Sequence, residues 1–201
     1  MPTGKNAIIL FSEVSEDVIR NSEAEQLVKI RRKGSIVPLA VQSDYAKEAL
    51  AGAVSGQSLA EAAKEGGYVV EPIAAGSDLS IVEGLDDERS LLDAIDKAFA
   101  LNTTKMLIVI VTPKLAVFYG LGIERGVDLE KPLPAACIAP TVSWICDLPL
   151  PAQVEAAPAY AVLKGLNFKA KEIAKMKNII AALELKIERD NRKPWDKHDC
   201  A

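Results

Sequence analysis

Histidine is almost absent from this sequence of 201 residues, and the only one is His198. Histidine is the commonest general base and a frequent metal ligand, so one distal copy cannot supply a Ser-His-Asp triad, a Cys-His pair or a histidine-rich metal centre. The cysteines are also few, and Cys137, Cys146 and Cys200 show no CxxC spacing. We interpret Cys137 and Cys146 as small hydrophobic residues of the core. The familiar nucleophilic mechanisms therefore lack their residues.

Long hydrophobic runs and an excess of basic residues are missing too. The longest apolar run, Met106 to Val111, has the length of a strand, far below the roughly 20 residues that a bilayer span needs. The first residues, MPTGKNAIIL, do not read as a signal peptide, so we expect a cytoplasmic protein without a membrane partner. A net charge of -4 and a pI near 5.2 argue against nucleic acid as a partner.

The residues that are present alternate between strand and helix patterns. Ser22 with Glu25, and Ser58 with Glu61, are capping-box signals for helix starts, and Gly34 is expected to end the first of these helices. The expected strands cover residues 6–11, 35–41, 68–73 and 106–112, and a further helix covers residues 86–101. This order predicts an α/β domain, a three-layer sandwich around a mostly parallel central sheet.

The C-terminal part has a different pattern. Between residues 166 and 187 apolar residues recur every three or four positions over about two heptads, interrupted at Lys169, and predict an amphipathic helix. We divide the chain into an α/β domain (1–165), a helical extension (166–190) and a polar tail (191–201). The helix either packs on its own domain or drives self-association through residues 166–187.

Four stretches, taken in order, resemble the alkaline phosphatase superfamily, which includes phosphatases, sulfatases and phosphodiesterases. They are SLAEAAKEGGYVV, RSLLDAIDKAF, LIVIVTPKLAVFYGLG and IAPTVSWICDLPLP, which together span about residues 58 to 163. The first resembles a helix-strand segment of that family, the third its metal-binding strand and loop, and the fourth a late helix. The resemblance implies an alkaline phosphatase-like core, here shortened, because members of the family tend to be much longer.

The resemblance also implies a chemistry that this chain cannot repeat. The family commonly uses a Thr, Ser or modified Cys nucleophile with metal ions held by Asp and His. Where the family has Asp-His-Gly, this chain has Lys114, Leu115 and Ala116. A lysine cation and a leucine side chain cannot ligate a divalent metal ion. We therefore expect no metal and no cofactor.

Other positions of the resemblance remain open to two interpretations. Glu13 stands near the first metal-binding acid of the family, although an acidic residue in the loop SEVSED is also explained by solvation or helix capping. Ser43 falls one residue off the spacing of the family nucleophile, and Lys47 lies four residues beyond it. Ser43 and Asp44 are equally explained as a helix N-cap. Lys114, in turn, either supplies positive charge to a pocket or extends into solvent.

These observations favour a non-catalytic, alkaline phosphatase-like protein, a pseudoenzyme that acts in binding or assembly as an oligomer. The alternative is a metal-free binder of phosphate or sulfate groups, or a residual phosphoester or sulfoester hydrolase. That alternative would use Glu13, Ser43, Lys47 and Lys114 to hold a small anionic ligand by charge-assisted hydrogen bonds. Convergence of the four side chains on one cleft would favour the alternative.

Overall fold

The computed structural model describes residues 4–40, 44–165, 176, 179–181, 183–185 and 187. The chain divides into two units, Met1–Lys164 and Gly165–Ala201, which are described separately. Within the described residues, no helix combines the length and the apolar character needed to cross a bilayer.

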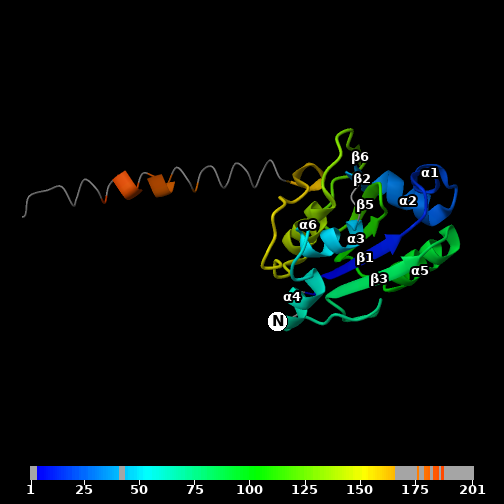
Figure 1. Cartoon of the computed structure of the whole chain (residues 1–201), viewed down its shortest axis with the longest axis horizontal. Helices are drawn as coiled ribbons and strands as arrows, with labels where there is room; N and C mark the ends of the chain where they lie inside the picture. Colours follow the sequence, from blue (N-terminus) through cyan, green and yellow to red (C-terminus); the bar gives the residue numbers. More distant parts are fainter. Residues whose placement is uncertain are drawn as a thin grey trace, which may run out of the picture. The chain divides into compact units, whose positions relative to one another are not determined.

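The first unit alternates strands and helices along the chain (Figure 1). Its strands are β1 (Asn6–Ser12), β2 (Ser35–Pro38), β3 (Leu79–Leu85), β4 (Met106–Val111), β5 (Leu115–Gly120) and β6 (Val127–Asp128). Its helices are α1 (Glu16–Asn21), α2 (Glu25–Lys33), α3 (Tyr45–Ala51), α4 (Leu59–Glu65), α5 (Glu88–Ala100) and α6 (Ile138–Cys146), with 3-10 turns η1 (Ala135–Cys137) and η2 (Tyr160–Val162). The predicted α/β class is confirmed.

The strands form one mixed six-stranded sheet in the order β3-β1-β4-β5-β2-β6. β1 is parallel to β3 and β4, and β2 is parallel to β6, whereas β5 is antiparallel to both β4 and β2. The prediction of a mostly parallel sheet is therefore wrong. The physical reason is the connection between β4 and β5, residues 112–114, which is long enough for a hairpin but far too short for the crossover that parallel neighbours require.

Helices pack on both faces of this sheet (Figure 1). On one face, α5 lies against β1 and β3 and α2 lies against β5, and Ile8 and Leu10 of β1 join the buried cluster beneath them. Because side chains alternate along a strand, Ala7 and Ile9 point to the other face, where α6 packs against β1 and β4. All seven residues of β1 are buried, as expected of a central strand covered on both sides.

The helix-start signals have mixed outcomes. The capping box of Ser58 with Glu61 is confirmed at the start of α4. The box predicted for Ser22 is wrong, because α2 begins at Glu25 after Ala24, which makes no side-chain capping bond. Ser22 instead ends α1, a helix that the pattern did not predict, and its hydroxyl donates to Glu88. The Ser22 oxygen accepts from the Ala24 N–H at 3.1 Å, so it is used in the link between α1 and α2 and not as a capping box.

The third predicted strand is also displaced along the chain. Within residues 68–73 the only ladder contact is a single bridge between Val70 and Leu79, and the true strand is β3. β3 has the sequence LSIVEGL, in which an acid and a glycine interrupt the apolar pattern. Glu83 and Gly84 are exposed. A strand whose apolar pattern is interrupted in this way, before the buried Leu85, gives a weak periodic signal.

In the second unit, every described residue between Met176 and Ile187 is helical. The large apolar side chains among them are more than half exposed; they are Met176, Ile179, Ile180, Leu183, Leu185 and Ile187. The rest of the predicted extension (166–190) and the polar tail (191–201) lie outside the described residues.

Candidate functional site

The carboxyl ends of β1, β3 and β4 meet at one edge of the sheet, which is where open α/β sheets usually bind ligands. A hollow of about 640 Å³ opens there between the end of β1, the start of α3 and the end of β3. Its charged lining consists of one lysine, Lys47, and four acids, Glu13, Asp44, Glu83 and Asp86. This hollow is therefore strongly acidic.

A second, smaller hollow of about 290 Å³ opens at the same edge, between the end of β1 and the β4–β5 turn. Glu13 lines this hollow as well, together with Glu16, Asp17 and the single lysine Lys114. Acids again outnumber bases. An anionic ligand would meet a surplus of like charge in either hollow, and such juxtaposition is unfavourable.

One hydrogen bond fixes the geometry of Glu13. The Tyr45 hydroxyl, at the start of α3, donates to Glu13 Oε1 at 2.8 Å, and the Tyr45 ring lies 6.2 Å from the ring of Phe11. Burial, reinforced by this bond to Glu13, raises the pKa of Tyr45 above its usual range. Tyr45 therefore stays neutral and occupies one oxygen of the carboxylate that both hollows share.

The residues that follow β4 form a tight turn. Thr112 is buried, its backbone N–H donates to the Leu115 carbonyl at 2.8 Å, and its hydroxyl accepts from the Leu115 N–H at 3.1 Å. Leu115 and Ala116 are fully buried in β5. The positions that the resemblance aligns with metal ligands are thus core residues of a strand, and only Lys114 faces solvent.

The structure brings together the predicted site residues only in part. Glu13 shares one hollow with Lys47 and the neighbouring hollow with Lys114, and all three side chains are exposed. Ser43 lies outside the described residues, while its neighbour Asp44 caps α3 by accepting from the Lys47 N–H. Sequence reasoning missed Tyr45, for which the only signal was an aromatic residue beside the expected helix start.

Other reactive groups of the described residues are inert or scattered. Cys137 and Cys146 are buried, as predicted, and burial raises the pKa of each thiol to about 12. Thiols with such a pKa are not nucleophilic at neutral pH. Within residues 4–40 and 44–165, no three His, Cys, Asp or Glu side chains are grouped as a metal site would require.

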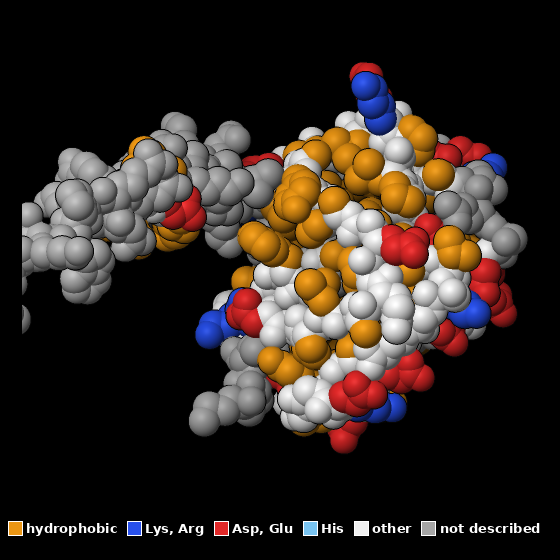
Figure 2. Space-filling model, turned by 60° about the vertical axis from the view of Figure 1, so that its left-hand side comes forward, with side chains coloured by type: hydrophobic (Ala, Val, Ile, Leu, Met, Phe, Trp, Pro, Cys, Tyr) orange, Lys and Arg blue, Asp and Glu red, His pale blue; other side chains and the backbone are white. Residues whose placement is uncertain are grey.

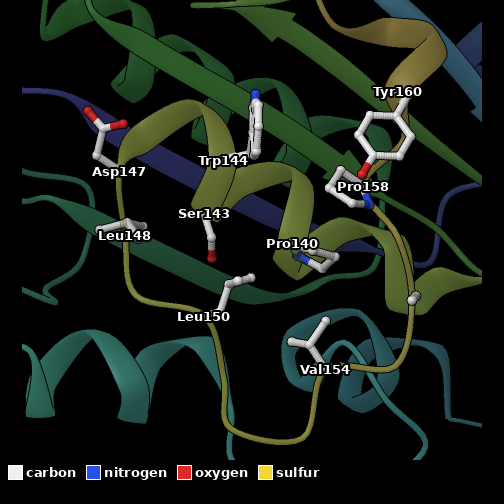
Figure 3. A pocket seen from close by; sticks show the side chains of 10 residues that line it. Pro140, Ser143, Trp144, Asp147, Leu148, Leu150, Val154, Pro158 and Tyr160 are labelled. Atoms are coloured by element: carbon white, nitrogen blue, oxygen red, sulfur yellow. The ribbon is translucent and has the colours of Figure 1, made fainter. Parts of the chain in front are cut away.

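A different surface feature lies on α6. Pro140, Ser143 and Trp144 lie on one face of α6, and together with Asp147 just after the helix they line one side of an apolar groove of about 460 Å³. The connection that follows α6 forms the other side with Leu148, Leu150, Val154, Ala156, Pro158 and Tyr160. In Figure 3 this connection leaves α6 at Asp147, passes Leu150 and Val154, and returns to Tyr160.

The groove exposes side chains that globular proteins usually bury. Trp144 is 45% exposed although its neighbours in α6 are buried, and Leu150 and Tyr160 are 56% and 47% exposed. Figure 2 shows hydrophobic side chains gathered on the α6 side of the domain, with acidic side chains mostly at the margin. Trp and Tyr dominate binding energy at protein interfaces. The sequence signal for this groove was a tryptophan in an otherwise apolar helix before LPLPAQ, and sequence reasoning did not use it.

Comparison of the chain with protein-family models, with curated proteins and with solved structures finds no match. The residues described above are therefore the basis for any functional assignment.

Proposed function

We propose that this chain is a non-catalytic protein that acts in binding and assembly, built on a shortened core resembling the alkaline phosphatase superfamily. The observation that carries the proposal is the contrast between two surfaces of one domain. The carboxyl edge of the sheet is acidic, and its β4–β5 turn is closed by the hydrogen bonds of Thr112. The groove on α6 is apolar and exposes Trp144 and Leu150.

Electrostatics supports the proposal at the carboxyl edge. Transfer of phosphoryl or sulfuryl groups requires positive charge around the transferred oxygens. In the larger hollow Lys47 faces four carboxylates, and in the smaller one Lys114 faces three. The side chains that line each hollow thus carry net negative charge, whereas these reactions need positive charge.

The second candidate is a metal-free site for a phosphate or sulfate group, and it is favoured by Lys47 and Lys114, which line two hollows that share Glu13. A thermal-shift series tests both candidates: phosphate, sulfate, Mg²⁺, Mn²⁺ and Zn²⁺ are added to the wild type and to Lys114→Ala. An anion at 100 times its dissociation constant would stabilise the fold by about 2.7 kcal/mol, which is a visible shift. We expect no anion shift in either protein.

Hydrolysis of p-nitrophenyl phosphate and p-nitrophenyl sulfate, with and without the same metal ions, completes the test. We expect no turnover above a buffer control. Turnover that Lys114→Ala abolishes, or an anion shift that this variant removes, would overturn the non-catalytic proposal in favour of the second candidate.

A further inference from the structure

Two apolar surfaces of this chain are exposed within the residues that the structure describes. One is the concave groove on α6, which spans both the helix and the connection that follows it. The other is formed by the exposed apolar side chains of the helical residues around Leu183. Exposed apolar surface of this kind marks interaction sites.

We propose that the groove of one copy receives the C-terminal helix of a second copy, so that two chains exchange these segments in a dimer. The inference rests on the proposed assembly function and names its partner. The contacting face is the stripe formed by Met176, Ile180, Leu183 and Ile187.

The stripe has the dimensions of a groove-binding helix. Its residues are separated by four, three and four positions, so they lie on one face, and Leu185 lies on the opposite face. From Met176 to Ile187 the stripe extends about 16 Å along the helix axis. Amphipathic helices commonly bind apolar grooves through anchors with this spacing.

Charge also favours this pairing. Residues 1–164 carry 15 Lys and Arg against 22 Asp and Glu, whereas residues 165–201 carry 9 against 6. The first unit is therefore acidic and the C-terminal segment basic. At the groove itself, Asp147 is already paired with Lys5, so the attraction comes from the opposite net charges of the two units. Complementary charge of this kind favours encounter and fixes orientation.

Symmetry favours a second copy as the donor. Residues 166–193 contain neither glycine nor proline, and the sequence pattern predicts a continuous helix from residue 166. Each chain then carries one groove and one stripe, and reciprocal exchange between two copies closes with two-fold symmetry and leaves neither surface unpaired.

Sedimentation equilibrium of the full chain between about 1 and 100 µM tests the proposal with two matched pairs of variants. Leu150→Glu changes the groove and Val54→Glu changes an exposed apolar side chain that does not line it. Leu183→Glu changes the stripe and Leu185→Glu the opposite face of the same helix. All four side chains are more than half exposed, so the variants should fold, as circular dichroism will show.

We expect a wild-type dimer, a dissociation constant raised about 100-fold by Leu150→Glu and by Leu183→Glu, and changes below about 3-fold for Val54→Glu and Leu185→Glu. Mixing Leu150→Glu with Leu183→Glu should produce heterodimers, seen by native mass spectrometry, because one intact groove then meets one intact stripe.

Other results would overturn the exchange and separate it from the function on which it rests. A dimer weakened by Leu183→Glu but not by Leu150→Glu would mean that the C-terminal helices of two copies pair with each other. Self-assembly would then hold, but the groove would not be its interface. A dimer that neither variant weakens would place the interface elsewhere, and a wild-type monomer up to 100 µM would remove self-assembly itself. Enzymatic turnover would instead refute the non-catalytic function and leave the dimer result unaffected.

Discussion

Replacing Thr112 by valine tests whether the turn after β4 is a structural closure. Thr112 is 1% exposed, and its hydroxyl accepts from the Leu115 N–H and donates to the Leu115 carbonyl, each at 3.1 Å. Valine keeps the shape of the side chain but leaves the buried Leu115 N–H without this acceptor, which costs roughly 1–3 kcal/mol. The Leu115 carbonyl still accepts from the Thr112 N–H. We therefore expect a loss of about 2 kcal/mol in the free energy of unfolding.

Urea unfolding followed by circular dichroism measures this loss, and for a domain of this size it corresponds to a fall of about 4–8 °C in Tm. Thr112→Ser retains the hydroxyl and removes one methyl group, so it should cost about 1 kcal/mol. Lys114→Ala changes an exposed side chain of the same turn and should stay within about 0.5 kcal/mol of wild type. A valine variant as stable as wild type, or no more destabilised than the serine variant, would refute the structural interpretation of Thr112.

Two further predictions concern the hairpin and the acidic edge. In Gly120→Ala the added Cβ would lie 2.2 Å from the Met106 carbonyl oxygen at a φ of +105°, so we expect the free energy of unfolding in urea to fall by more than about 3 kcal/mol. The control is Gly67→Ala, where φ is +78° and the space is open, and there we expect a loss of about 1–2 kcal/mol. Equal losses in the two variants would contradict the close contact at Gly120. Burial and the bond to Glu13 raise the pKa of Tyr45, so its contribution to stability is complete below about pH 10 and is lost as the pH rises further. The stability difference between wild type and Tyr45→Phe should therefore shrink from pH 8 to pH 11, and a constant difference would contradict this linkage.

Local signals predicted most elements whose ends depend on nearby residues. Ser58 and Glu61 satisfy each other across a single turn, so their spacing is sufficient to locate the start of α4. β1 and β4 are central strands buried on both faces, and a continuous apolar run identifies such strands directly. The helix over residues 86–101 likewise has an apolar stripe and an acidic start, and the structure places α5 there.

The errors occur where distant residues decide the outcome. Ser22 has Glu25 at capping-box spacing, but its hydroxyl donates to Glu88 of α5 and accepts from the Ala24 N–H, outside the start of α2. The hairpin at residues 112–114 lies between two apolar runs, a pattern that is typical of a β-hairpin, but the resemblance to a strand followed by a ligand loop led to the other interpretation. The groove on α6 could not be predicted, because it depends on how the connection after Asp147 folds over one helical face.

The two surfaces of the domain follow from the lengths of two connections. At the carboxyl edge, β4 and β5 are joined by only three residues, and once Thr112 has bound Leu115 the only charged side chain that this turn offers to a ligand is Lys114. After α6, the connection from Asp147 to Ala159 is long enough to cross the surface and leave Trp144 in a groove. Binding residues in α/β domains usually lie on loops that a rigid scaffold positions. The short turn and the long connection therefore favour the groove, and not the carboxyl edge, as the binding surface that we propose.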